Sequence, residues 1–239
     1  MSTPPALPER GSYAVSTEEL AGVLHQADNR IRMARDSLDA VHQDVSRSLV
    51  ALGEVEIEVR KGERGVGHPF ALQQAFEDLR RRSEQASVDA GEVREHLGHT
   101  RGALAAGQVL LAGMPAPDTD QERVDRDAMH TRLGRLHQRI GEILPIAEDL
   151  TDRTKATGEL ATRGRDRARS DRAEVHDLNQ DVARSRVVAR DLDGPVDAAE
   201  VDVHRAAGQA QAVASAARLR TTQTGRHHGP QVAPAGIRR

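Results

Sequence analysis

The sequence predicts an all-α protein built from long antiparallel helical hairpins, an elongated coiled-coil-like bundle with disordered termini. Small and apolar residues recur in alternating steps of four and three, which is the 3.5-residue repeat of a helical seam. Asp171 is the only ionisable residue at a seam position, although 30% of the chain is charged. With one Tyr, two Phe and no Trp in 239 residues, a thick globular core is not expected.

The first predicted hairpin spans residues 16–111, with a turn near 61–68. Ser16 and Glu19 have the spacing of a capping box at the start of its first helix. Pro69 suits the first position of its second helix, because that position needs no N–H. The seam residues of this hairpin are Leu20, Leu24, Ala27, Ile31, Ala34, Leu38, Val41, Val45, Ser48, Leu52, Val55, Val59, Leu72, Phe76, Leu79, Ser83, Ala86, Ala90, Val93, Leu97, Thr100 and Leu104.

A second long helical region is predicted over residues 120–220, after a linker at 112–119 that contains two prolines. Its seam continues in one phase, which favours one long helix kinked at Pro145 and Pro195. Its seam positions from 154 to 171 carry no large apolar residue, which favours a turn. We expect a second hairpin with a break between 158 and 171, and a straight rod is the alternative.

The seam of this second region has a different character from that of the first hairpin. Threonine, alanine and glycine replace large apolar residues in its middle, and alanine dominates its end. Residues 1–15 and 221–239 lack the repeat and are predicted to be disordered. The seam residues are Met129, Leu133, Leu136, Ile140, Ile143, Ala147, Leu150, Thr154, Thr157, Ala161, Gly164, Ala168, Asp171, Val175, Leu178, Val182, Ser185, Ala189, Leu192, Val196, Ala199, Val203, Ala206, Ala210, Val213 and Ala217.

Catalytic chemistry has little support in the sequence. The chain has no cysteine, which excludes disulfides, thiolate nucleophiles and cysteine-ligated metals. It has no nucleophile elbow and no HExxH motif. The run GERGVG at 62–67 follows a predicted helix instead of a strand, so we interpret it as a hairpin turn and not as a phosphate loop. We therefore predict no catalytic residue, no cofactor and no enzymatic activity.

Metal binding is tested by the spacing of histidines and carboxylates, since residues three or four apart share a helix face. In the phase of the seam these groups lie beside it or on the outer face, whereas a bundle-core site needs inward ligands from several helices. We therefore predict no metal site. The groups concerned are Asp39 with His42, Asp127 with His130, and Glu92, Glu95, His96 and His99.

The sequence does not favour nucleic acid or membranes as partners. Arginines gather at 80–82 and at 163–172, but the second group alternates with Asp166 and Asp171, as on a solvated ion-paired face. The formal net charge is −3. The longest apolar run, 109–112, is far shorter than the ~20 residues that span a bilayer. We expect a cytoplasmic protein with no membrane span.

The alanine-rich end of the seam is the predicted docking surface. Small residues allow close helix approach but bury little area, so we expect this face to pack on a protein partner or on a second copy in a homo-oligomer. The leading function is a non-enzymatic coiled-coil scaffold or adaptor that acts through helix–helix interactions. The residues of this predicted interaction face are Ala199, Val203, Ala206, Ala210, Val213 and Ala217.

The stretch GVGHPFALQQA at 65–75, followed by a long Leu/Ala helix, resembles a hairpin of uncharacterised helical proteins from high-GC bacteria. The matching motif is His68, Pro69, Leu72 and Ala75, and the resemblance covers about residues 16–111. Some of those proteins carry a toxin domain or are associated with secretion. The resemblance implies a packing or delivery module, so a secretion- or toxin-associated helical module is the alternative function. An Arg-mediated nucleoid-binding protein is a third.

Overall fold

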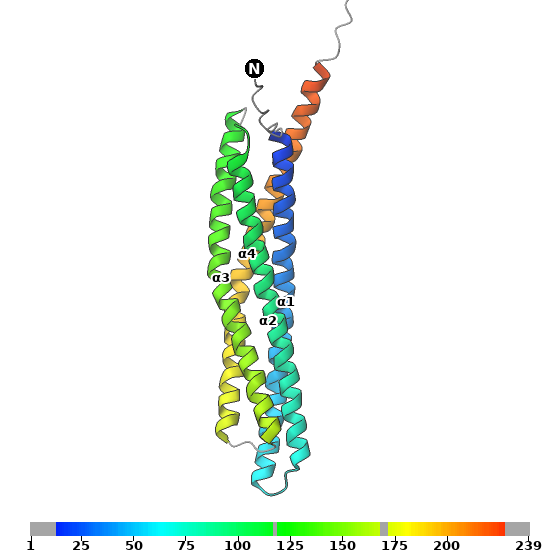
Figure 1. Cartoon of the computed structure of the whole chain (residues 1–239), viewed down its shortest axis with the longest axis vertical. Helices are drawn as coiled ribbons and strands as arrows, with labels where there is room; N and C mark the ends of the chain where they lie inside the picture. The colour runs from blue at the N-terminus through cyan, green and yellow to red at the C-terminus, as the bar shows by residue number, and fades with distance from the viewer. Residues whose placement is uncertain (1–12, 117–118, 168–171, 228–239) are drawn as a thin grey trace, which may run out of the picture.

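The computed structural model describes residues 13–116, 119–167 and 172–227, and within these ranges the chain is helical with no strand. Its helices are α1 (Tyr13–Glu63), α2 (Pro69–Gly113), α3 (Asp120–Arg167) and α4 (Arg172–His227). Consecutive helices pack against each other, and α4 packs back on α1. The result is a closed up-down-up-down bundle of two hairpins (Figure 1). The predicted all-α fold of antiparallel helical hairpins is confirmed.

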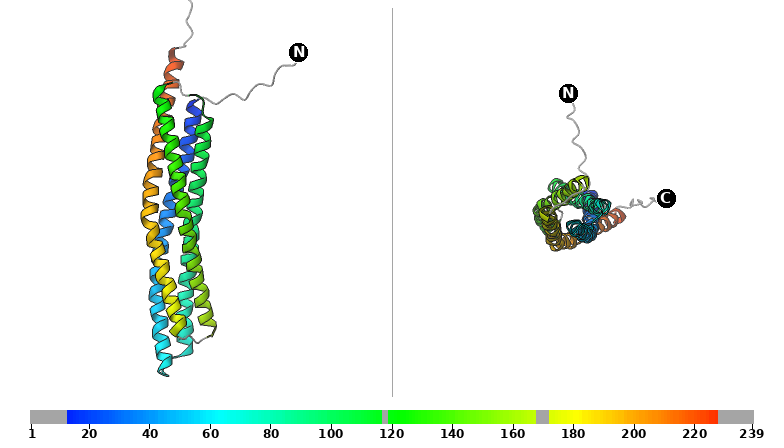
Figure 2. Two further views of the ribbon diagram at one scale, coloured as in Figure 1. Left: turned by 90° about the vertical axis from the view of Figure 1, so that its left-hand side faces the viewer. Right: turned by 90° about the horizontal axis from the view of Figure 1, so that it is seen from below.

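The bundle is a narrow rod. Helix α1 has 51 residues, which at 1.5 Å per residue is about 75 Å. Seen along the rod, the helices are arranged as a ring (Figure 2). The pairs α1–α3 and α2–α4 lie across this ring and make no backbone approach of the kind that neighbours make. Each helix therefore buries one face toward the axis and leaves the other to solvent.

The α1–α2 turn is closed by backbone hydrogen bonds and by glycine. Val66 N–H donates to the Lys61 carbonyl at 3.0 Å and Gly65 N–H donates to the Gly62 carbonyl at 3.0 Å, which is a Schellman motif. Gly65 has φ = 70°, a conformation that glycine adopts without steric cost. A Cβ on Gly67 would lie 2.6 Å from Gly62 N, so that position requires glycine. The glycine-rich run is thus a helix-ending turn.

Two helix starts have side-chain caps. His68 Nδ1 accepts from Phe70 N–H at 3.3 Å, and Pro69 begins α2, as its missing N–H allows. At α3, Thr119 Oγ1 accepts from Glu122 N–H and the Glu122 carboxylate accepts from Thr119 N–H, both at 3.2 Å. This reciprocal pair is a capping box. It stands where the predicted linker 112–119 meets the second helical region.

Some predicted boundaries need correction. Helix α1 begins at Tyr13, which packs against the core, so Ser16 lies inside the helix and does not cap it. Residues 13–15 and 221–227 are helical, although both stretches were expected to be disordered. The rest of the predicted disordered ends, 1–12 and 228–239, lies outside the described residues. The alternative of a straight rod over 120–220 is not observed, because α3 ends at Arg167 and α4 begins at Arg172, and the two helices form a second hairpin. Both internal prolines lie within continuous helix.

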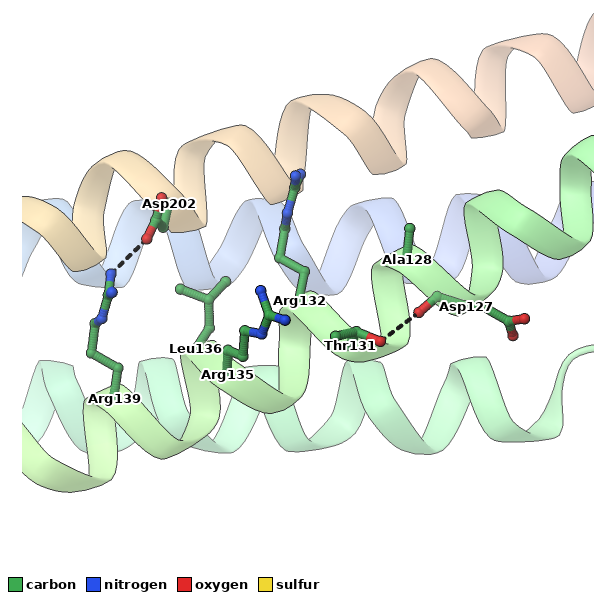
Figure 3. Close-up of a pocket in the computed structure, with 8 residues that line it drawn as sticks. All are labelled: Asp127, Ala128, Thr131, Arg132, Arg135, Leu136, Arg139 and Asp202. Atoms are coloured by element: carbon green, nitrogen blue, oxygen red, sulfur yellow. Dashed lines mark hydrogen bonds and ion pairs between the residues drawn. The ribbon is translucent and has the colours of Figure 1, made fainter.

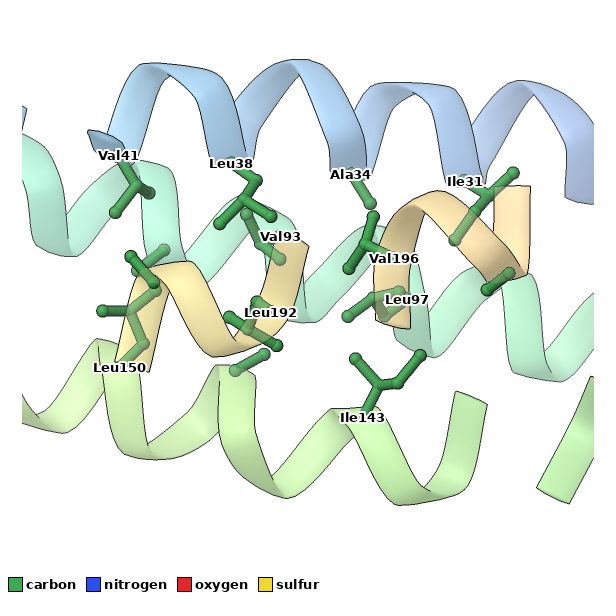
Figure 4. Close-up of a cluster of buried hydrophobic side chains, with 14 of the residues drawn as sticks. Ile31, Ala34, Leu38, Val41, Val93, Leu97, Ile143, Leu150, Leu192 and Val196 are labelled. Carbon is green, nitrogen blue, oxygen red and sulfur yellow. The ribbon is translucent and has the colours of Figure 1, made fainter. Parts of the chain in front are cut away.

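The core follows the predicted seam (Figure 4). Every predicted seam residue of α1 is buried, and so is every one in the described part of α3. In α2 and α4 the half-buried exceptions are Leu72 and Val213. Near the C-terminal end of α4, Ala214 is buried in place of Val213, so the repeat shifts by one residue there. Ala168 and Asp171 lie outside the described residues.

Phe76 is the one aromatic ring fully buried in the described core, and Gly164 makes room for it. A Cβ built on Gly164 would overlap the Phe76 ring. The missing side chain on α3 therefore matches the large side chain on α2. This pairing explains a glycine at a seam position, where glycine otherwise weakens a helix.

We predict that Gly164→Ala destabilises the bundle by about 1–3 kcal/mol, because the added methyl group forces the Phe76 ring to move. Gly98→Ala is the matched control, since Gly98 is exposed and its Cβ would meet open space. We expect the control to stabilise the protein by roughly 0.5–1 kcal/mol through helix propensity. Urea unfolding measures both free energies. A Gly164→Ala variant as stable as the control would contradict this packing.

Candidate functional site

The structure places the predicted interaction face inside the bundle. Five of its six residues are buried, and Val213 is half-buried. In this region α4 lies along α1, as the ion pair of Arg35 with Asp197 at 2.8 Å and the contact of His204 Nδ1 with Asp28 at 3.3 Å show. The facing part of α1 also has alanines in its seam, Ala27 and Ala34. The alanine face is therefore covered by the chain's own helices, which corrects the expectation of an open docking surface. The face in question is Ala199, Val203, Ala206, Ala210, Val213 and Ala217.

Two arginines of the first predicted group, at 80–82, form ion pairs with carboxylates of the chain itself. Glu77 on α2 accepts from Arg80 at 2.7 Å, from Arg81 at 3.0 Å and from Arg165 of α3 at 2.9 Å. The hydrogen bonds from Arg80 and Arg165 hold the pKa of the Glu77 carboxyl far below its ordinary value of 4.5. This cluster joins α2 to α3 near the end of the rod.

The second group, at 163–172, also pairs with carboxylates. Arg172 holds Glu63 of α1 through two hydrogen bonds of 2.8 Å, and Arg167 pairs with Glu174 across the α3–α4 connection. Arg172 lowers the pKa of Glu63 through its hydrogen bond. Most described arginines of this group are thereby neutralised at the helix ends.

Among the histidines and carboxylates weighed as metal ligands, Asp39 and His42 make other contacts. His42 Nε2 lies 2.8 Å from Asp193 of α4, and Asp39 pairs with Arg35 at 3.0 Å. Within the described ranges no three His, Asp or Glu side chains converge as metal ligands would. No helix there has a stretch long and apolar enough to cross a membrane.

A groove between α3 and α4 is the strongest candidate for a binding site (Figure 3). It has a volume of about 570 Å³ and lies on the half of the bundle where α3 begins. Three arginines at positions i, i+3 and i+7 project from one face of α3 into it. The lining residues are Asp127, Ala128, Thr131, Arg132, Arg135, Leu136, Arg139 and Asp202.

The arginines of this groove differ in how they are held. Arg139 donates to Asp202 of α4 at 2.6 Å, and Arg132 donates to the Gln209 amide oxygen of α4 at 2.5 Å. Arg135 is exposed and makes no hydrogen bond or ion pair within the described residues. In Figure 3 the Arg135 side chain lies over α3 beside Leu136, while Arg132 and Arg139 extend toward α4. The groove thus holds one guanidinium available to an external anion, flanked by two that tie α3 to α4.

The groove exists because α4 packs more closely on α1 than on α3. Among the neighbouring helix pairs, α3 and α4 have the fewest close backbone approaches. In Figure 1, α4 leans away from the start of α3 and toward the start of α1 as it ascends. Alanine seams on α1 and α4 permit a short interaxial distance, which draws α4 to that side. Close packing of the alanine face of α4 on α1 therefore leaves the groove on the opposite side of α4, between α4 and α3.

Sequence reasoning missed this groove because its arginines do not form a contiguous run. Their spacing of three and four places them on one helix face, and that spacing was the available signal. The convergence with Asp202 and Gln209 of α4 depends on the turn between the helices and on how α4 leans. Comparison of the chain with protein-family models, curated proteins and solved structures gives no match.

We predict that Glu77→Gln destabilises the protein at pH 7 by on the order of 1 kcal/mol, because three guanidinium groups lose the Glu77 carboxylate, while Arg80 keeps Glu84 and Arg165 keeps Asp166. The pKa of Glu77 is lowered on folding, so its stabilisation is present above the ordinary pKa of 4.5 and is lost as the pH falls below it. The difference between wild type and variant should therefore shrink toward pH 2. Urea unfolding across pH tests this, and a difference that is constant with pH would contradict it.

Proposed function

We propose that the protein is a non-enzymatic helical scaffold or adaptor that binds a partner protein through an acidic segment seated in the α3–α4 groove. The observation that carries this proposal is Arg135, a guanidinium inside the groove that no described residue neutralises. Guanidinium groups bind carboxylates with two parallel hydrogen bonds, which gives both energy and orientation. An acidic side chain of a partner is the natural counterpart.

The charge around the groove supports an anionic occupant. Arg205 of α4 lies 3.7 Å from Asp202, so this carboxylate is already shared between two arginines. Among the lining residues, three guanidinium groups stand against the carboxylates of Asp127 and Asp202. The excess positive charge would steer an acidic segment toward the groove and fix its register.

A protein segment fits the groove better than a nucleic-acid strand. The carboxylates of Asp127 and Asp202 would repel regularly spaced phosphates, whereas a peptide can place its acids beside Arg135 and its neutral residues beside those aspartates. No aromatic side chain is among the lining residues to stack on bases. We therefore favour a scaffold over a nucleoid-binding protein.

The rigid rod supports an adaptor role because it carries this groove on continuous helices. A site built on helices holds its side chains more precisely than one built on loops. The alanine seam is buried within the chain, so a homo-oligomer would form through outer faces and leave the core unchanged. The groove and the outer faces are then the surfaces through which partners are held.

We predict that a fluorescein-labelled peptide in which glutamate alternates with glycine binds the protein and that Arg135→Glu weakens this binding at least about tenfold, because the free guanidinium is replaced by a repelling carboxylate. Arg82→Glu is the matched control, with the same change in net charge at an exposed arginine of α2 that makes no hydrogen bond or ion pair within the described residues. Fluorescence anisotropy measures both affinities.

Three results would contradict the proposal. The first is no binding of the glutamate peptide by the wild-type protein. The second is an equal loss of affinity in the Arg82→Glu control, which would indicate attraction by net charge alone. The third is tighter binding of a single-stranded oligonucleotide of the same charge, which would favour the nucleic-acid alternative.

A further inference from the structure

One layer of the core is lined by hydroxyl groups from all four helices. Its position is fixed by residues that the sequence places far apart, each at a seam position of its own helix. All the lining side chains are buried. The layer contains Val45 and Ser48 of α1, Ser83 and Ala86 of α2, Thr154 and Thr157 of α3, and Val182 and Ser185 of α4.

Most of these hydroxyl groups already donate a hydrogen bond to a backbone carbonyl of their own helix. Ser48 Oγ donates to the Asp44 carbonyl at 2.9 Å and Ser185 Oγ to the Asp181 carbonyl at 2.9 Å, each one turn back on its own helix. Thr154 and Thr157 donate to carbonyls of α3 in the same way. Each of these oxygens keeps lone pairs that can accept a further hydrogen bond.

Ser83 is the exception. The residue is 2% exposed, and its Oγ has no hydrogen-bond partner among the described residues. A buried hydroxyl without a partner costs free energy, since it has lost water and gained nothing in return. The neighbouring hydroxyls offer acceptors but none lies within bonding distance of Ser83 Oγ. A small polar molecule between them would accept from Ser83 Oγ and donate to two of the facing oxygens.

The space among these side chains matches one water molecule. The cavity measures about 10 Å³, which is close to the smallest volume that holds a water. A buried water needs two to four polar partners. Ser83 can donate to the water oxygen, and the water can donate its two protons to oxygens of the facing hydroxyls. Purely apolar cavities stay dry, whereas five of the eight residues around this one carry hydroxyl groups.

We propose that this layer binds one water molecule, held by Ser83 and bridged to the hydroxyls of the other helices. The water links α2 to helices with which Ser83 makes no direct hydrogen bond. The layer then joins the helices through hydrogen bonds at one level of a mainly apolar core. This proposal is independent of the function assigned to the α3–α4 groove.

The proposal is tested by whether Ser83→Ala lowers or raises the free energy of unfolding. If the water is present, the variant removes its anchor and leaves the water or its partners unsatisfied. If the cavity is dry, the variant removes an unsatisfied hydroxyl and stabilises the protein. Ser46→Ala is the matched control, because Ser46 Oγ makes the same one-turn bond, to the His42 carbonyl at 2.7 Å, on an exposed face. Comparison with this control removes the contribution that the higher helix propensity of alanine makes to both variants.

We expect the unfolding equilibrium constant of Ser83→Ala to rise about fivefold relative to Ser46→Ala, the factor that corresponds to one lost hydrogen bond. Urea unfolding measures both. A Ser83→Ala variant as stable as the control, or more stable, would overturn the proposal.

A direct measurement separates lost water from altered packing. Magnetic relaxation dispersion of ¹⁷O-labelled water counts waters with long residence times. We expect the wild-type protein to hold one more such water than Ser83→Val, whose side chain fills the space. Equal counts in the two proteins would overturn the proposal whatever the stabilities are.

Discussion

Burial of one narrow seam within a single chain is the constraint on which the rest of this structure depends. Each helix presents small and aliphatic residues every 3.5 positions and charged residues elsewhere, so a helix alone has no means of burying its apolar stripe. Four antiparallel helices in a ring bury all four stripes at once. Transfer of apolar area from water supplies the main driving force, at about 25 cal/mol per Å². The ion pairs at the helix ends then align helices that the seam already holds.

Variation in side-chain size along the seam produces the local features. Alanines draw α4 toward α1, and the groove between α3 and α4 opens as a consequence. Gly164 on α3 gives space to Phe76 on α2. The hydroxyl layer around Ser83 interrupts the apolar seam at one level. A helix that slid by one heptad would oppose its hydroxyls to leucines elsewhere in the core, so this layer also favours one register of the four helices.

The fold was predictable from the sequence because the heptad repeat is long and excludes charge. The seam positions from Leu20 to Val59 are all buried, which a one-dimensional pattern could state without any knowledge of the partner helix. What covers each face could not be predicted this way. Seams that close within one chain and seams that close between chains have the same pattern, so the alanine face of α4 was assigned to a partner. The groove around Arg135 depends on how α4 leans relative to α3. The missing hydrogen-bond partner of Ser83 depends on which residues α1, α3 and α4 bring beside it.

The most direct test of the central claim is the dependence of the unfolding midpoint on protein concentration. Seams that close within one chain give a midpoint in urea that is the same over about a hundredfold range of concentration, because folding is then unimolecular. Circular dichroism follows the loss of helix. We predict no change in the midpoint. A midpoint that rises steadily with concentration would show that folding is coupled to association, and would contradict a bundle closed within a single chain.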